Sequence, residues 1–206
     1  MRAIEGEGHA PGRLREMATR DDWMRAALRT LAAGGIAAVR IDALARDLGV
    51  TRGSFYWHFA DRDDLLKTAL ELWEREFTAQ VIKELAGVDD PAERLERLVR
   101  SAFGDELVPG LQPAIMADAD RPVVIPVLRR VTAQRIDFIA AIYQDLGLAP
   151  PDARRRALLA YAAYLGWHDL RRGPSDAAPE VHAGPERTAA VDELVRILLA
   201  DIPGRA

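Results

Sequence analysis

Side chains suited to nucleic-acid contacts are concentrated in one short stretch of the chain, RGSFYWHF. An arginine such as Arg52 donates paired hydrogen bonds to a guanine edge, and Ser54 suits either base edges or phosphate oxygens. Gly53 leaves out a side chain where a helix must approach the bases closely. Tyr56 and His58 have polar tips that suit phosphate oxygens. The stretch therefore predicts one face of a DNA-contacting helix.

The aromatic residues of this stretch divide into an inner and an outer set. Phe55 and Phe59 stand four residues apart, so both lie on the inner face of a helix and Trp57 points outward. Burying an aromatic ring stabilises a protein by roughly 1.5–3 kcal/mol, so an indole left at a free surface favours a surface that DNA covers. The alternative is an ordinary helical hairpin in which Trp57 packs on a neighbouring element.

The flanking residues predict a helix-turn-helix that would position these side chains. Apolar residues at i, i+3, i+4 and i+7 predict a short first helix over 41–48: Ile41, Leu44, Ala45 and Leu48. Gly49 supplies a residue that tolerates positive φ at the turn, and Thr51 stands where a helix N-cap is needed. The second helix is expected from Arg52 to about His58, in the place of a recognition helix for the major groove.

The run from Gly35 to Leu66 resembles the DNA-binding domain of the TetR/AcrR family of bacterial transcriptional regulators. The resemblance depends on Gly34-Gly35, Ile41, Leu44-Ala45, LGVT at 48–51, GSFYWHF at 53–59 and residues 61–66. One departure is Arg40, because the family often has Thr or Ser there as a cap; Arg40 offers a phosphate contact instead. The predicted DNA-binding residues are Arg40, Thr51, Arg52, Gly53, Ser54, Tyr56, Trp57, His58 and Arg62.

Composition limits the classes of protein that the chain can represent. The 206 residues are 49% apolar, and no apolar run approaches the eighteen residues of a membrane span, so no membrane partner is expected. The first residues lack the apolar region of a secretory signal, and there is no cysteine, so a cytoplasmic protein is expected. The net charge is −4, yet residues 13–62 contain nine arginines and six acids. This asymmetry favours DNA contacts at the N-terminal end.

The predicted fold is all-α, with about nine helices and three parts: a flexible arm over 1–18, the helix-turn-helix domain over 19–66 and a helical domain over 67–206. A capping box at Thr19–Asp22 begins the first helix, which ends at Gly34-Gly35. The helix that begins after Asp61 is expected to continue to about Ala86, linking the two domains. In the family that the chain resembles, this link carries ligand-driven motion to the recognition helices.

Prolines and glycines divide the C-terminal part into further helices. Helices are predicted from Pro91 to about residue 104, over 112–118, from Pro122 or Val124 to Leu146, over 150–172 and over 184–202. Pro126 requires either a kink or the later start, and Asp120 is expected to cap a helix that begins at Pro122. The Pro-rich loop over 173–184 is expected to be mobile.

The last two helices have more apolar surface than one buried face requires. A helix that is apolar most of the way round must be buried on two sides, so we expect these helices to form a four-helix interface in a two-fold homodimer. The predicted interface residues are Leu158, Tyr161, Ala162, Leu165, Leu194 and Leu198. A monomeric helical core is the alternative.

The chain contains no nucleotide-binding loop, nucleophile elbow, H-E-x-x-H motif or dinucleotide fingerprint, so neither catalysis nor a cofactor is expected. Its four histidines are scattered, which argues against a metal site. The resemblance implies a ligand cavity in the C-terminal half. Its candidate lining residues are Trp73, Phe103, Met116, Phe138, Tyr143, Tyr164, Trp167 and His168.

The resemblance implies a transcriptional regulator that binds double-stranded DNA at a palindromic operator as a homodimer. The leading hypothesis is a repressor that an unknown small-molecule effector releases from the operator. The alternative is a helical small-molecule-binding protein or enzyme in which the N-terminal hairpin is structural. That alternative leaves the exposed Arg52, Tyr56, Trp57 and His58 without an explanation.

Overall fold

A computed structural model describes residues 18–104 and 108–203, and within these ranges the chain is helical without a β-strand. The α-helices are α1 (Arg20–Ala38), α2 (Ile41–Asp47), α3 (Arg52–Phe55), α4 (Arg62–Glu74), α5 (Gln80–Leu85), α6 (Pro91–Phe103), α7 (Leu111–Ala117), α8 (Ile125–Asp145), α9 (Pro150–Leu170) and α10 (Gly184–Leu198). A π-helical segment (Arg75–Ala79) joins α4 to α5, so the described residues form nine separate helices, and a 3₁₀ turn (Pro179–Val181) precedes α10. The all-α prediction is confirmed. The predicted arm over 1–18 lies outside the described residues, apart from Ala18.

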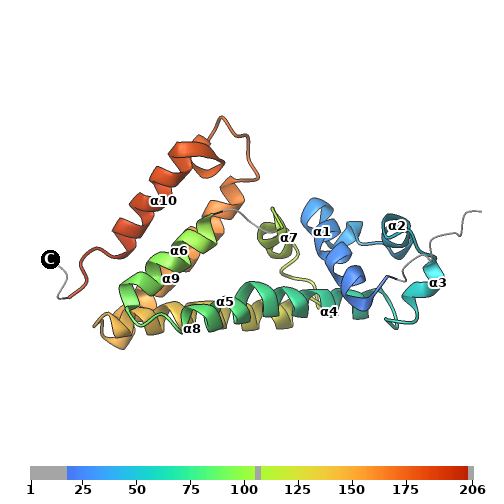
Figure 1. Cartoon of the computed structure of the whole chain (residues 1–206), viewed down its shortest axis with the longest axis horizontal. Coiled ribbons are helices and arrows are strands. Elements are labelled where there is room, and N and C mark those ends of the chain that lie inside the picture. The colour runs from blue at the N-terminus through green and yellow to red at the C-terminus, as the bar shows by residue number, and fades with distance from the viewer. Residues whose placement is uncertain (1–17, 105–107, 204–206) are drawn as a thin grey trace, which may run out of the picture.

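A long rod of α4, the π-helical segment and α5 runs along the molecule, with α8 beside it (Figure 1). Helices α1, α2 and α3 gather at one end of this rod. Helices α6, α9 and α10 gather around the other end, and α7 lies between the two groups (Figure 1). The linking helix predicted from the sequence is confirmed, and its π-helical turn was not predicted.

Helix α1 begins and ends as the sequence indicates. Thr19 Oγ1 accepts a hydrogen bond from the backbone N–H of Asp22, and the Asp22 carboxylate accepts one from the Thr19 N–H at 2.8 Å. These two contacts complete the capping box. The Thr19 hydroxyl also donates to the Asp22 carboxylate at 2.7 Å, and this bond, together with the one from the Thr19 N–H, lowers the pKa of Asp22. At the other end Gly35 has φ of 69°, so the helical path breaks there before a short turn to Ala38.

The C-terminal helices agree with the punctuation of the sequence, with one correction. Helix α8 begins at Ile125, which places Pro126 in its first turn where its missing N–H does no harm. The expectation that Asp120 caps a helix at Pro122 is therefore wrong. The nearby Asp118 contacts α1: its Oδ2 accepts a hydrogen bond from the Ile36 backbone N–H at 3.0 Å.

Two apolar cores hold the molecule together. One joins α1–α4 to α7 and to the beginning of α8, with Trp23, Phe55 and Leu65 fully buried. The other joins α6, α8, α9 and α10 around Tyr143 and Leu95. The first core includes α7 and part of α8, so the helices α1–α3 at this end pack directly on elements of the C-terminal half. No described helix is both long enough and apolar enough to cross a bilayer.

Candidate DNA-binding surface and ligand cavity

The turn between α2 and α3 fixes how the second helix is presented. Gly49 has φ of 69°, and the N–H of Val50 reaches back to the carbonyl of Ala45 at 2.9 Å. Thr51 is the N-cap residue of α3, as the sequence predicted, with the extended backbone of that position, but its side chain makes no capping hydrogen bond. Its carbonyl accepts from the Ser54 hydroxyl at 2.9 Å instead. The Thr51 hydroxyl is thus not engaged in a cap.

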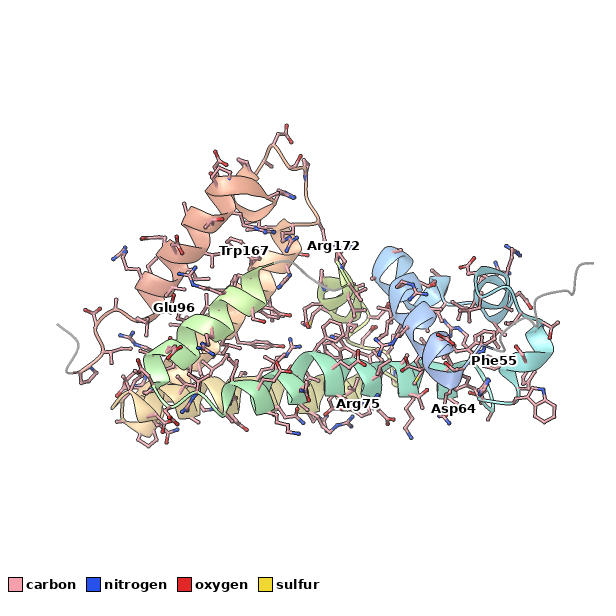
Figure 2. The ribbon with its side chains drawn as sticks, viewed as in Figure 1. Phe55, Asp64, Arg75, Glu96, Trp167 and Arg172 are labelled. Carbon is pink, nitrogen blue, oxygen red and sulfur yellow. The ribbon has the colours of Figure 1, made fainter. Side chains whose placement is uncertain are left out.

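Two phenylalanines anchor α3 and the turn that follows it. Phe55 is 0% exposed and Phe59 is 3% exposed, their rings stack 5.4 Å apart, and Phe55 also meets the edge of Trp23. Figure 2 labels Phe55 between α1 and α3. Regular helix ends at Phe55, and the N–H groups of Trp57 and His58 continue it with three-residue turns.

The outward side chains stand together on one convex surface, which we call the reading surface: Arg52, Gly53, Tyr56 and Trp57. Trp57 is 81% exposed and Tyr56 is 54% exposed. The Tyr56 hydroxyl accepts from Arg52 at 3.4 Å, and Asp42 lies 3.4 Å from the same guanidinium; both contacts raise the pKa of Arg52. Arg52 therefore carries a fixed positive charge beside two exposed rings.

The packing of the protein itself does not require glycine at position 53. A Cβ built there would meet nothing nearer than Thr51 Oγ1 at 3.7 Å, which is an ordinary contact. The absent side chain therefore leaves room outside the fold, on the same surface as Arg52 and Trp57.

Two predicted contact residues are used inside the protein. The Nε2 of His58 lies 3.0 Å from the Ala18 carbonyl, and the ring is half-buried. Arg62 donates from Nε to the Val39 carbonyl at 2.7 Å and from its terminal nitrogen to the Ile36 carbonyl. Arg62 therefore fastens the α1–α2 connection to α4, and this long-range contact left no signal in the local sequence. Arg40 is exposed without a capping bond, and Ser54 is half-buried.

The C-terminal half encloses a cavity of about 220 Å³ between α4, the π-helical segment, α6, α7, α8 and α9. Five of the predicted residues line it: Trp73, Phe103, Phe138, Tyr164 and His168. Met116, Tyr143 and Trp167 do not. Tyr143 is buried elsewhere, donates to the Leu198 carbonyl at 3.0 Å and has its pKa raised to about 12 by burial. Trp167 packs its ring edge against Phe103 (Figure 2 labels it on α9).

The sequence analysis missed the polar part of the cavity. Arg135, Gln112 and Thr78 line it, and Arg135 donates to both of the others at 3.0 Å. Each of the three lies on a different helical segment, so no local spacing could have grouped them. Among the described residues no group of His, Cys, Asp or Glu side chains is placed to hold a metal ion.

One predicted interface residue also belongs to this cavity. Tyr161 is 4% exposed, stacks on Tyr164 at 5.9 Å and lines the cavity, so its assignment to the dimer interface is wrong. Leu158 and Ala162 are exposed on the outer side of α9. Leu165, Leu194 and Leu198 are half-buried.

Comparison with known proteins agrees with this architecture. Residues 24–69 match the family model for bacterial regulatory proteins of the tetR family. The regulator AcrR of Shigella flexneri is 39% identical over 56 residues, which are 27% of this chain and 25% of AcrR. The regulator BetI of Stenotrophomonas maltophilia is 29% identical over 156 residues, covering 73% of this chain and 79% of BetI. The alignment with AcrR thus spans about a quarter of that relative.

Solved structures share the whole fold. A TetR-family regulator from Agrobacterium tumefaciens superposes with a TM-score of 0.71 at 19% identity, covering 86% of this chain and 96% of that one. AibR, solved with isovaleryl coenzyme A and operator DNA, gives a TM-score of 0.65 at 15% identity, covering 86% and 96% of the two chains. A helix-turn-helix set on a helical body defines a class of DNA-binding regulators. Residues 24–69 therefore match the DNA-binding part of the tetR family of bacterial regulatory proteins, and the described chain has the fold of the solved TetR-family structures.

Proposed function

We propose that the protein is a repressor that binds a palindromic operator as a homodimer and leaves it when a small-molecule effector fills the C-terminal cavity. The observation that carries the DNA-binding part is the reading surface. Trp57 and Tyr56 stay 81% and 54% exposed, while the two phenylalanines beside them are buried. Packing would favour burying these rings, and a duplex covering them gives them a partner. AibR, a structural relative, was solved with operator DNA.

The homodimer is supported by an apolar surface on the last two helices. Leu158, Leu159 and Leu170 of α9 are 55%, 68% and 55% exposed, and Ile197 of α10 is 51% exposed. The exposed Gly166 lies along the same helix and allows a partner to approach closely. A patch of this kind is typical of a protein interface, and a two-fold axis through it repeats the reading surface once on each protomer.

The effector response is supported by the position of α7. Leu111 and Gln112 of α7 line the cavity, and the chain directly after α7 holds α1 through Asp118 and Ile36. A ligand in the cavity therefore contacts α7, and the chain after α7 is bonded to α1, which packs against the helix-turn-helix. In the proposed cycle, a ligand shifts the protein between two arrangements of the reading surfaces, only one of which fits the operator.

The test is operator selection from random duplexes, followed by affinity measurement across a salt series. The proposal predicts an inverted repeat whose half-sites lie about one helical turn apart, roughly 34–36 Å. It also predicts that the logarithm of the association constant falls linearly with the logarithm of the salt concentration. Selection of no sequence, together with salt-insensitive binding, would instead support a helical small-molecule-binding protein with a structural hairpin. Genomic DNA upstream of the protein's own gene serves as an independent second probe.

A further inference from the structure

The cavity contains one arginine, Arg135, that has no acid partner among the residues that the structure describes. Arg135 of α8 is half-buried, and its guanidinium donates to Thr78 Oγ1 at 3.0 Å, Gln112 Oε1 at 3.0 Å, the Tyr164 hydroxyl at 3.3 Å and the Phe77 carbonyl at 3.1 Å. All four acceptors are neutral. Within the described residues no carboxylate forms an ion pair with Arg135.

Arg130, another arginine of α8, forms an ion pair with an acid and lies outside the cavity. Arg130 lies five residues earlier on the same helix, and its terminal nitrogen contacts the Glu74 carboxylate at 2.5 Å. It does not line the cavity. The two arginines thus differ in one respect that matters here: among the described residues, Arg130 has a carboxylate partner and Arg135 has none.

A buried donor without an acceptor lies beside Arg135. Gln112 of α7 is 4% exposed; its Oε1 is taken by Arg135, and its buried Nε2 has no hydrogen-bond partner. Buried donors are normally paired, so an orphaned amide nitrogen on a cavity wall indicates an acceptor that arrives from outside the protein. The guanidinium and this amide nitrogen belong to hydrogen-bonded neighbours on the same wall.

Two other charged or titratable side chains that line the cavity, Glu76 and His168, have contacts of their own. Glu76 is held by Arg25 on its outer side, at 2.6 Å and 3.0 Å. His168 is buried with its Nε2 2.9 Å from the Ala102 carbonyl. The remaining walls are largely aliphatic and aromatic, formed by residues such as Leu95, Val99 and Phe138.

We propose that the cavity binds an organic anion, a carboxylate on an apolar body, with the carboxylate oxygens accepting hydrogen bonds from Arg135 and from Gln112 Nε2. The cavity of about 220 Å³ has room for an organic molecule rather than for a single water. A quaternary ammonium ligand fits poorly, because the Arg135 guanidinium already lies 5.3 Å from the ring centres of Trp73 and of Tyr164. The anion is the effector of the repressor proposed above, so this inference names the chemical class of that ligand.

Isothermal titration of the full-length protein, without DNA, tests the ligand class. The probes are octanoate, decanoate and 4-phenylbutyrate, with octan-1-ol and octyltrimethylammonium as the neutral and cationic counterparts of octanoate. At least one carboxylate should bind about tenfold or more tightly than its neutral counterpart, and the ammonium should bind most weakly. Equal binding of octanoate and octan-1-ol with no stronger carboxylate, or tightest binding of the ammonium, would overturn the proposal.

Variants then assign the anion to its partners. Arg135→Met should weaken the best carboxylate about tenfold or more and leave octan-1-ol unchanged, whereas the matched control Arg130→Met should change neither. Gln112→Leu, which also removes the orphaned donor, should weaken the carboxylate alone, and Arg135→Lys should have an intermediate effect if the methionine variant does not fold. Carboxylate affinity unaffected by Arg135→Lys and Gln112→Leu would contradict the assignment. Because DNA is absent from these titrations, their failure leaves the DNA-binding proposal standing, and operator binding is measured separately.

Discussion

Arg52 is the residue of the reading surface best suited to base recognition. Its guanidinium is held by two weak, exposed contacts, to Tyr56 and Asp42, and both can be exchanged for contacts with a duplex. An arginine that pairs with a guanine edge carries sequence information, whereas a phosphate contact carries none. We therefore propose that Arg52 reads bases and that the aromatic rings beside it fill the groove.

Arg52→Ala should relax base preference. We expect a loss of about 1–3 kcal/mol in binding free energy on the selected operator and little loss on random DNA, because the paired donors to a base edge disappear. Fluorescence anisotropy on both duplexes measures the difference. An equal loss on both would assign Arg52 to phosphate.

Gly53→Ala separates the protein's own stability from its contact with DNA. Because a Cβ at Gly53 meets nothing closer than an ordinary contact with Thr51 Oγ1 at 3.7 Å, the free energy of unfolding should stay unchanged or rise by about 0.4–1 kcal/mol. Operator affinity should fall, since the new methyl group stands between the helix and the bases. Urea unfolding and anisotropy give the two values, and unimpaired operator binding would show that α3 does not approach DNA at this position.

At the scale of helices, α7 is in contact with both the cavity and α1. It supplies Gln112 to the cavity wall and precedes Asp118, whose carboxylate reaches the backbone N–H that follows the Gly35 break in α1. The Cβ that any other residue would add at Gly35 would stand 3.3 Å from that carboxylate. The break in α1 is thus shaped to receive the α7–α8 connection.

Asp118→Ala should weaken the attachment of α1 to the C-terminal half. It leaves the partly buried Ile36 N–H without an acceptor, which should lower the free energy of unfolding by about 1–3 kcal/mol. Asp118→Asn retains a carbonyl oxygen and serves as the matched control, with a smaller loss. Equal urea midpoints for the alanine variant and the wild type would contradict the contact.

Local signals predicted the helices well and the polar contacts between them poorly. The capping box at Thr19, the turn at Gly49 and the buried Phe55–Phe59 pair follow from spacing, and all three are present. Arg62 bonds to carbonyl groups that lie 23 and 26 positions earlier in the chain. Arg135 bonds to Gln112, which lies 23 positions earlier and on a different helix. Such contacts depend on packing, which periodicity does not encode. Tyr161 was misplaced for the same reason: an apolar helix shows which residues need burial and not which neighbour buries them.

For the whole molecule, dimer geometry decides whether two reading surfaces reach one operator. Leu159→Arg places a charge in the most exposed leucine of α9, 68% exposed, and should convert a dimer to a monomer, because a charge buried at an interface without a partner is strongly unfavourable. Sedimentation equilibrium measures the change, and operator affinity should fall with it.

Ile125→Arg is the matched control for the dimer. Ile125 is also an exposed apolar residue, 39% exposed, but it lies at the start of α8, away from α9 and α10. This variant should sediment as the wild type does. A wild-type protein that is monomeric at micromolar concentration, or a Leu159→Arg variant that remains dimeric, would contradict an interface on this face.

The central claim is that DNA covers the reading surface, and acrylamide quenching of tryptophan fluorescence tests it most directly. Of the four tryptophans, Trp57 is 81% exposed, Trp23 and Trp73 are at most 1% exposed and Trp167 is half-buried, so a neutral quencher reports mainly on Trp57. The account predicts strong quenching of the free protein, marked protection when the selected operator is bound, and weak quenching of Trp57→Phe whether or not DNA is present. Undiminished quenching in a saturated operator complex would show that the indole stays in solvent and would contradict the claim.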